Sequence, residues 1–488
     1  MNQEESVQGM AVDADGAAAV AERPNPFYEA PAAKKKMTLF GIFFTVAAAT
    51  SFLSVISTIL PIAAQEIGGT DIYAFTSTLN AVGSAVTMPL WGYIAARKPA
   101  SKRTLFCASM LVGVVCILIL ATAQNIFVVI ASGFFYGTMS AAVFVLSYTM
   151  VRDMYPPKQA GSYLGIAGAI MAAAAIAGPI VTGVAIQAIG WRAACHIFWP
   201  FIVIGCAMVL SGMRVDPKEV EYLASKGGKF DPISTLCLVV TLTAFVTALS
   251  LGSNYVPFGS LASNVLIAVA VVFGVLTVLA VRAKGDDAII PISAVRDRDT
   301  LCFMFANLFT NFSNLAAYFF LPTYALYAMG CSAVEAALTI SAFSFLSMFV
   351  SPLFGKIIGQ TGNARLVLVF GTVARIVVTA LLLLLMSPDM SIWLLCGVCL
   401  LGGIASASYG TGLSAGPQIQ LKPELRVQGN SFIQMGQAFG NSIGLAIYTI
   451  VMATFGVVAG MRIALAISIA AACAALVFVL MLSKKGAR

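Results

Sequence analysis

Apolar stretches recur along almost the whole chain, and each is close to the length that an α-helix needs to cross a lipid bilayer. A helix spans the apolar core of a bilayer with about 20 residues, and fourteen stretches reach or approach that length. They are residues 37–64, 72–96, 104–123, 126–151, 160–189, 193–213, 233–252, 261–281, 300–327, 333–358, 366–386, 391–415, 428–455 and 461–482. Lipid offers no hydrogen bonds to an exposed backbone, so each stretch should be helical. The pattern predicts an all-α integral membrane protein with fourteen transmembrane helices.

Charged residues are scarce and unevenly placed. Only 10% of the residues are charged and 60% are hydrophobic, a composition that excludes an ordinary soluble domain. If the N-terminus is cytoplasmic, 25 of the 28 lysines and arginines fall on the cytoplasmic side, which is the side that basic residues favour. We therefore expect a multi-pass protein of the plasma membrane with cytoplasmic N- and C-termini. The net charge of +8 then reflects membrane-flanking loops and requires no nucleic-acid partner.

Two short motifs occur twice, in the same order. The sequence PLWG at 89–92 returns as PLFG at 352–355, 263 residues later, and GVAI at 183–186 returns as GLAI at 444–447, 261 residues later. Matches at nearly the same offset indicate duplicated halves. Because the offset spans eight helices, two helices must be inserted between two units of six.

The repeat predicts the organisation of the whole chain. The expected parts are a disordered cytoplasmic tail (1–36), an N-terminal six-helix bundle (37–213), a cytoplasmic linker (214–232), two inserted transmembrane helices (233–281), a cytoplasmic loop (282–299), a C-terminal six-helix bundle (300–482) and a cytoplasmic tail (483–488). A basic loop follows the proline motif of each half, with Gly92 and Arg97 in the first and Gly355 and Arg365 in the second. Two parallel halves around a central site are the plan of a transporter that rocks between two states.

The fifth stretch has a face of small residues at every fourth position, beginning with Gly161 and Gly165. Such a face lets another helix backbone approach closely. Gly178-Pro179 then removes a backbone hydrogen bond, which predicts a kink in the middle of the membrane. The residues predicted to form movable seams or hinges are Gly178, Pro179 and Gly183, with Gly440 and Gly444 in the thirteenth stretch. A tightly packed helix with a structural proline is the alternative interpretation.

Uncharged polar residues follow single faces of several stretches. Asn307, Asn311, Asn314 and Tyr318 recur at helical spacing in the ninth stretch, as do Gln434, Gln437 and Asn441 in the thirteenth, and Ser54 and Asn80 belong to similar rows in the first two. Amides that faced lipid would lack hydrogen-bond partners, so these rows should face water or protein. They either line a polar cavity or join helices to one another.

Arg375 is the one charge expected near the middle of the membrane. Placing an arginine there costs on the order of 3 kcal/mol, so it should have a function. It could bind an anion, or its long side chain could extend to the membrane surface. None of the twenty acidic residues lies deep in a stretch, and buried acids are the usual proton carriers and partners of cationic drugs.

Neither a metal site nor a cofactor is expected. The ten cysteines lie almost wholly in apolar stretches, where buried thiols are common, and His196 is the only histidine. A membrane-embedded enzyme would need a nucleophile, base or metal constellation that these residues do not offer. No nucleotide-binding loop is evident either, so gradients rather than ATP would drive transport.

Several motifs together resemble the 14-helix, drug:proton-antiporter-like branch of the major facilitator superfamily. They are LPIA at 60–63, GP at 178–179 followed by GWR at 190–192, FLPTY at 320–324 and FGNSIG at 439–444. The resemblance covers almost everything after the N-terminal tail. It implies two six-helix bundles plus two inserted helices, and a central cavity lined by helices 1, 2, 4 and 5 and their counterparts 9, 10, 12 and 13.

The chain departs from this branch at charged positions. Phe52 and Ala96 stand where the branch carries acids, and Gly133 and Gln437 stand where it carries arginines. These departures predict a transporter that does not run the usual acid-based proton antiport of cations.

We therefore expect a monomeric secondary transporter of a small molecule that works by alternating access in the lipid bilayer. It should export a neutral, zwitterionic or amphiphilic solute. The first alternative is a proton-coupled multidrug antiporter that uses acids at the membrane edge, such as Asp153 or Glu335. The second is a non-transporting receptor or scaffold derived from a transporter, which the loss of the acid at Ala96 favours.

Overall fold

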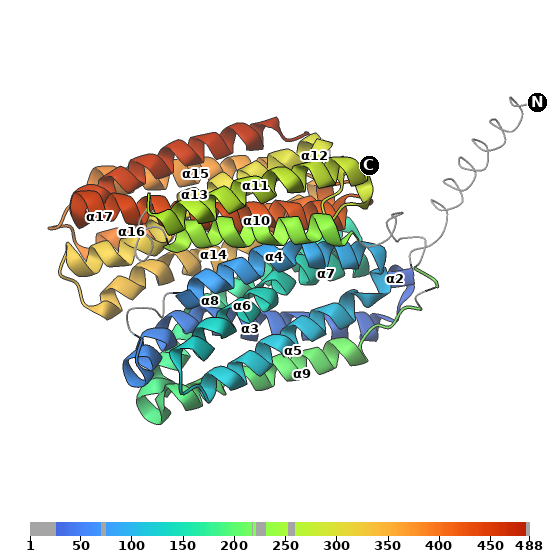
Figure 1. Cartoon of the computed structure of the whole chain (residues 1–488), viewed down its shortest axis with the longest axis horizontal. Helices are drawn as coiled ribbons and strands as arrows, with labels where there is room; N and C mark the ends of the chain where they lie inside the picture. The colour runs from blue at the N-terminus through green and yellow to red at the C-terminus, as the bar shows by residue number, and fades with distance from the viewer. Residues whose placement is uncertain (1–25, 70–74, 217, 221–230, 252–258, 485–488) are drawn as a thin grey trace, which may run out of the picture.

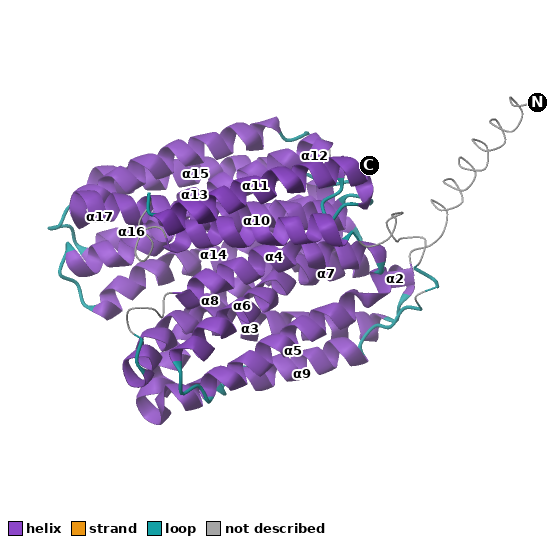
Figure 2. Cartoon of the chain, in the orientation of Figure 1, coloured by secondary structure: helices purple, strands orange, loops and turns teal. Residues whose placement is uncertain are grey.

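The computed structural model describes residues 26–69, 75–216, 218–220, 231–251 and 259–484. Helices joined by short loops make up this part of the chain, and it contains no strand (Figure 2). Helices from the first part of the chain lie together, and those from the last part form a second group beside them (Figure 1).

The N-terminal half begins with one turn of helix and continues with long apolar helices. Its elements are α2 (Pro26–Glu29), α3 (Ala32–Ile67), α4 (Phe75–Arg97), η1 (Pro99–Ser101), α5 (Lys102–Ala121), α6 (Ile126–Ala142), the π-helical turn η2 (Val143–Ser147), α7 (Tyr148–Met154), α8 (Pro157–Cys195) and α9 (Trp199–Ser211). Buried side chains from α3 and α5 to α9 form one apolar core, in which Phe52 and Tyr136 pack with ring centroids 5.5 Å apart.

The second part of the chain contains two further helices and then the C-terminal half. Its elements are α10 (Pro232–Leu251), α11 (Leu261–Lys284), η4 (Gly285–Asp287), α12 (Ile292–Arg296), α13 (Arg298–Tyr327), α14 (Ala333–Thr361), α15 (Arg365–Leu385), α16 (Ile392–Gln420) and α17 (Arg426–Met481). Gly456 interrupts α17 with a φ of 74° and a ψ of 173°. This conformation suits glycine and not L-residues with side chains, so α17 contains two of the predicted stretches on either side of Gly456.

Each predicted apolar stretch overlaps a helix; residues 72–74 and 252 lie outside the described residues. Ten helices of the described part are long and apolar enough to cross a membrane. Helix α13 is not among the ten, because Asn307, Asn311 and Asn314 interrupt its apolar sequence. The membrane fold is therefore confirmed as all-helical, and fourteen crossings stay a prediction.

The N-terminal tail is more ordered than the sequence suggested. Residues 26–29 form α2, and α3 begins at Ala32, five residues before the predicted start. The reason is that Phe27 is buried, the Tyr28 hydroxyl accepts a hydrogen bond from Arg152, and Lys35 donates to the Tyr28 carbonyl. The rest of the predicted tail (1–25), most of the linker 214–232 and the last four residues lie outside the described residues.

Helix α10 packs at the junction of the two halves. Its Leu238, Leu242 and Val246 form a buried cluster with Val82 of α4 and Met435 of α17. Helix α11 lies outside α10, and many of its apolar side chains are exposed, as expected for a surface that meets lipid.

Several basic loops gather at one end of the bundle, which we call the basic end. This end carries α2 and the C-terminal end of the described chain (Figure 1). The start of α5 and the end of α7 meet there through the Lys102–Asp153 pair, and Arg152 of α7 donates to Tyr28 of α2. The backbones of α8 and α14 also meet closely at this end: a Cβ atom on Gly359 would lie 2.7 Å from the Lys158 carbonyl oxygen.

Candidate functional site

A cavity of about 300 Å³ lies between the two halves. Its N-terminal wall consists of Thr50, Phe144, Tyr148, Gly168, Met171, Ala172 and Ala175. Its C-terminal wall consists of Asn307, Asn311, Asn314, Tyr318, Phe343, Ser344, Ser347, Ser351, Ser406, Tyr409, Gly410, Leu413, Ser414, Gln434 and Gln437. No acidic or basic residue is among these lining residues. The cavity thus has one mainly apolar wall and one mainly polar wall.

The asparagines of α13 combine the two roles that the sequence left open. Asn307 is buried and donates from Nδ2 to the Ile433 carbonyl oxygen of α17 at 2.9 Å, so it joins two helices. Asn311 is half-buried and donates from Nδ2 to the side-chain oxygen of Asn307 at 2.7 Å. Both residues line the cavity. The row therefore holds helices together and also places amide groups at the cavity surface.

The glutamines of α17 divide these roles between them. Gln434 is buried and donates to the Leu413 carbonyl oxygen of α16 at 3.3 Å. Gln437 is half-buried and lines the cavity together with Gln434. A half-buried amide beside the cavity can exchange water for a solute without breaking a contact between helices.

Three predicted cavity residues do not line it. Ser54 donates its hydroxyl to the Thr50 carbonyl oxygen at 3.0 Å, within α3. Asn80 of α4 and Asn441 of α17 are half-buried, and neither is among the cavity residues. No residue of α4 lines the cavity, and Ser54 and Asn441 lie one turn beyond the lining residues Thr50 and Gln437 on the same helical faces.

Three serines of α14 that were not predicted as cavity residues also contribute to its wall. Ser344, Ser347 and Ser351 all line the cavity. Their spacing of three and four residues places them on one helical face, and this signal was available in the sequence. It was overlooked because serine is common in membrane helices, where its hydroxyl can bond to the preceding turn.

Arg375 of α15 points inward, behind the polar wall. Its side chain is 2% exposed, and Nη2 donates to Asn314 Oδ1 at 2.6 Å and to the Tyr409 hydroxyl. The guanidinium carbon lies 5.0 Å from the centre of the Tyr409 ring and 5.9 Å from that of Phe343. The side chain therefore does not extend to the membrane surface, which was one of the two alternatives.

Glycines of α8 and α14 form a close seam between the halves at the basic end. A Cβ atom on Gly355 would lie 2.4 Å from the Gly161 carbonyl oxygen, and one on Gly165 would lie 2.7 Å from the Ser351 carbonyl oxygen. A Cβ atom on Gly183, near the other end of α8, would meet no atom within 4 Å. Close packing between the halves along α8 is thus concentrated at the basic end.

Most of the predicted hinge residues pack within their own halves. Helix α8 is continuous through Gly178-Pro179, its non-helical residue is Gly190 with a φ of 83°, and a kink at Gly178-Pro179 stays a prediction. A Cβ atom on Gly178 would lie 2.8 Å from the Ser51 carbonyl oxygen of α3, and the Ser51 hydroxyl donates to the Ala174 carbonyl oxygen at 3.4 Å. Gly440 and Gly444 of α17 pack against α13, where a Cβ atom on Gly440 would lie 2.2 Å from the Leu308 carbonyl oxygen.

The two basic-loop motifs have different surroundings. Arg97 lies over the Tyr93 ring at 3.9 Å and forms an ion pair with Asp287 of η4 at 3.6 Å. Gly92 packs against Ser431 of α17, which brings the halves together a second time at the basic end. Arg365 instead begins α15, and its backbone N–H donates to the Asn363 side chain.

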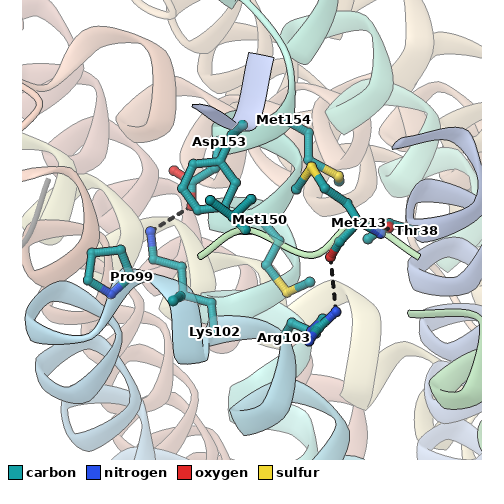
Figure 3. Close-up of a pocket in the computed structure, with 11 residues that line it drawn as sticks. Thr38, Pro99, Lys102, Arg103, Met150, Asp153, Met154 and Met213 are labelled. Atoms are coloured by element: carbon teal, nitrogen blue, oxygen red, sulfur yellow. Dashed lines mark hydrogen bonds and ion pairs between the residues drawn. The ribbon is translucent and has the colours of Figure 1, made fainter. Parts of the chain in front are cut away.

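The acids at the membrane edge are occupied by structural contacts. Asp153 accepts a hydrogen bond from Lys102 at 2.6 Å beside a pocket of about 40 Å³, little more than the volume of one water molecule (Figure 3). Glu335 forms a capping box with Ser332 at the start of α14. Trp191 donates to Glu66 at 2.5 Å, and this bond, together with that from Arg192, lowers the pKa of Glu66 below its ordinary value.

The described residues contain no group of three or more His, Cys, Asp and Glu side chains that could hold a metal ion. His196 is exposed and accepts a hydrogen bond from the Trp199 indole at 3.0 Å. The geometry of the site is therefore that of a chargeless cavity between two helical halves.

Comparison with known proteins agrees with this geometry. The Major Facilitator Superfamily profile matches residues 39–445. Multidrug resistance protein 3 of Bacillus subtilis is 22% identical over 427 residues, covering 85% of this chain and 79% of the relative. Efflux pump apf11 of Gibberella fujikuroi is 23% identical over 431 residues, covering 85% of this chain and 75% of the relative.

Solved structures give the same fold. The crystal structure of the human organic anion transporter MFSD10 (TETRAN) superposes with a TM-score of 0.65 at 12% identity, covering 93% of this chain and all of that one. At this identity the likeness concerns the fold alone. Since the family profile matches most of the chain, the protein belongs to the major facilitator superfamily and is a multi-pass membrane transporter, not an enzyme.

Proposed function

We propose that the protein exports an amphiphilic, non-cationic solute across the plasma membrane by alternating access, as a monomer with cytoplasmic termini. The observation that carries this proposal is the cavity between the halves, with amides on one wall and apolar side chains on the other. Such a cavity can hydrogen-bond the polar part of a solute on one wall and pack against its apolar part on the other.

The glycine seam supports the alternating-access mechanism. Because Gly161, Gly165 and Gly355 allow backbone contact, the halves can close tightly at the basic end with no side chains to rearrange. We assign the basic end to the cytoplasm, since basic loops favour that side. The structure then represents a carrier closed toward the cytoplasm. Export is the direction that the names of both relatives suggest.

The surroundings of the edge acids argue against proton coupling. An acid whose pKa is lowered, such as Glu66, stays ionised near neutral pH and does not take up a proton there. Asp153 is held by Lys102, and Glu335 caps α14. The alternative is a proton-coupled multidrug antiporter, and the Bacillus relative is named a multidrug resistance protein, so the experiment must include a cationic probe.

Counter-flow in proteoliposomes tests the proposal. Vesicles containing the purified full chain are assayed for exchange of chloramphenicol (neutral), decanoylcarnitine (zwitterionic), 1-naphthoate (anionic) and ethidium (cationic). We expect exchange of at least one of the first three, and no acceleration when a pH gradient is imposed. Strong pH-driven ethidium exchange would establish the antiporter instead. If no probe exchanges, the receptor or scaffold alternative replaces the proposed function.

A further inference from the structure

The buried guanidinium of Arg375 is the only part of the site that the proposed function does not use. Arg375 hydrogen-bonds to Asn314 and Tyr409 through Nη2 alone. Its Nε and Nη1 atoms are buried and have no hydrogen-bond partner within the described part of the chain. Arginine does not lose its proton inside proteins. A permanent positive charge is therefore only partly satisfied at this position.

Within the described part of the chain, no carboxylate forms an ion pair with Arg375. The three ion pairs formed by described residues are Arg97–Asp287, Lys102–Asp153 and Arg192–Glu66. Each of them is at an end of a helix, and none involves Arg375. Buried charges are ordinarily paired, because it is unfavourable to move a charged group from water into the protein interior without a counter-charge. The absence of an internal partner leaves the counter-charge to be supplied by something else.

The charge of Arg375 reaches the cavity through two residues of its wall. Arg375 donates to the Tyr409 hydroxyl, and Tyr409 in turn donates to Asn314 Oδ1 at 2.7 Å. Both Tyr409 and Asn314 line the cavity. No acidic or basic residue is among the lining residues, and Arg375 is a buried full charge in direct contact with two of them. In surroundings of low polarity such a charge acts strongly over a short distance.

We propose that the cavity takes an amphiphilic organic anion whose carboxylate binds against Asn314 and Tyr409, with Arg375 supplying the counter-charge. This inference rests on the proposed function and narrows its substrate class. The carboxylate accepts from the Asn314 amide N–H and from the Tyr409 hydroxyl, which turns from Asn314 Oδ1 toward the solute. The apolar part of the solute lies along Met171 and Phe144 of the opposite wall. Arg375 also joins α15 to α13 and α16 in the empty carrier.

Matched ligand pairs test this proposal. Thermal unfolding of the purified full chain is measured with benzoate and benzamide, 1-naphthoate and 1-naphthamide, and decanoate and decanamide. A ligand that binds the folded state raises its apparent melting temperature. We expect at least one carboxylate to raise it more than the amide of the same shape. Equal shifts within all three pairs would overturn the proposal.

Variants separate binding from a purely structural role. Arg375→Gln should weaken carboxylate binding by at least about tenfold, the loss expected when a charged hydrogen bond is removed, and Arg375→Lys should retain part of it. Arg462 offers a matched control, because it is an exposed arginine whose Nη2 donates to the Met386 carbonyl oxygen. Arg462→Gln should bind carboxylates as the wild type does. A carboxylate preference that survives Arg375→Gln would overturn the proposal.

Asn314→Asp provides a test that does not depend on the folding of Arg375 variants. The new carboxylate would stand 2.6 Å from Nη2, where the amide oxygen is now. It should raise the melting temperature of the empty protein and abolish the preference for carboxylate ligands. A lower melting temperature, or an unchanged preference, would contradict an uncompensated charge at Arg375.

The outcomes distinguish this inference from the proposed function. Counter-flow of chloramphenicol or decanoylcarnitine, with no carboxylate preference in the binding assay, would refute the anion-binding inference and support the proposed transport function. Carboxylate binding without counter-flow of any probe would support the site and overturn the transport function.

Discussion

The two walls of the cavity come from the N-terminal and C-terminal halves of the chain, and they differ in chemistry. Five amide side chains stand on the C-terminal wall: Asn307, Asn311, Asn314, Gln434 and Gln437. The N-terminal wall has no amide, and the hydroxyl of its Tyr148 lies 3.4 Å from the sulfur of Met171. A solute between them would be oriented, with its polar group toward α13 and α16 and its apolar part toward α8.

The seam does not share this difference. Both halves contribute glycines to it, on α8 and on α14, and a side chain at these positions would hold the two backbones apart. Under the proposed function, the C-terminal half would therefore supply most of the recognition, whereas both halves would contribute to movement.

A substitution in the glycine seam between α8 and α14 is expected to have the largest effect on transport. Gly355→Leu should reduce transport by about 100-fold, because a side chain that starts 2.4 Å from the Gly161 carbonyl oxygen overpacks the closed state. Counter-flow at equal protein content measures this loss. Gly183→Leu is the matched control, since nothing lies within 4 Å of a Cβ atom there, and it should transport normally. Normal transport by Gly355→Leu would show that the halves do not close along this seam.

The walls themselves can be compared by one substitution in each. Asn311→Leu should weaken solute affinity by up to about tenfold, since one net hydrogen bond is worth about 0.5–1.5 kcal/mol. Met171→Leu on the opposite wall conserves volume and apolarity and should change affinity by no more than about twofold. Affinity is read from the concentration dependence of counter-flow. Equal losses in the two variants would mean that the walls do not divide recognition as proposed.

The sequence predicted the fold well and the site in part. Helical stretches follow from length and apolarity, and the amide rows at 307–318 and 434–437 follow from periodicity, because both signals are local. The inward direction of Arg375 could not be predicted, since it depends on which face of α15 packs against α13 and α16. The non-helical residue of α8, Gly190, likewise could not be predicted, because any of the glycines of this helix can adopt a positive φ.

Stability should distinguish amides that join helices from those that only face the cavity. Asn307→Leu removes the bond to the Ile433 carbonyl oxygen and should lower the free energy of unfolding by about 1–2 kcal/mol. Gln437→Leu, at a half-buried amide on the same wall, should change it by less than about 0.5 kcal/mol. Thermal unfolding in detergent ranks the two variants. The reverse order would reassign the joining role to Gln437.

The smallest effect concerns Glu66 at the edge of the N-terminal half. Hydrogen bonds from Trp191 and Arg192 lower its pKa from 4.5. A lowered pKa stabilises the folded protein above that ordinary value, and this contribution is lost as the pH falls through the folded-state pKa.

At pH 7, Glu66→Gln should therefore melt slightly below the wild type, and the two curves should converge as the pH falls below 4.5 and through the folded-state pKa. The difference should be small, because the Glu66 and Arg192 side chains are 52% and 37% exposed. Transport between about pH 6 and pH 8 should be identical in the two proteins, since Glu66 is ionised throughout this range. A shift in the pH profile of transport in Glu66→Gln would make Glu66 a proton carrier, and the N-terminal half would then contribute to coupling as well as to movement.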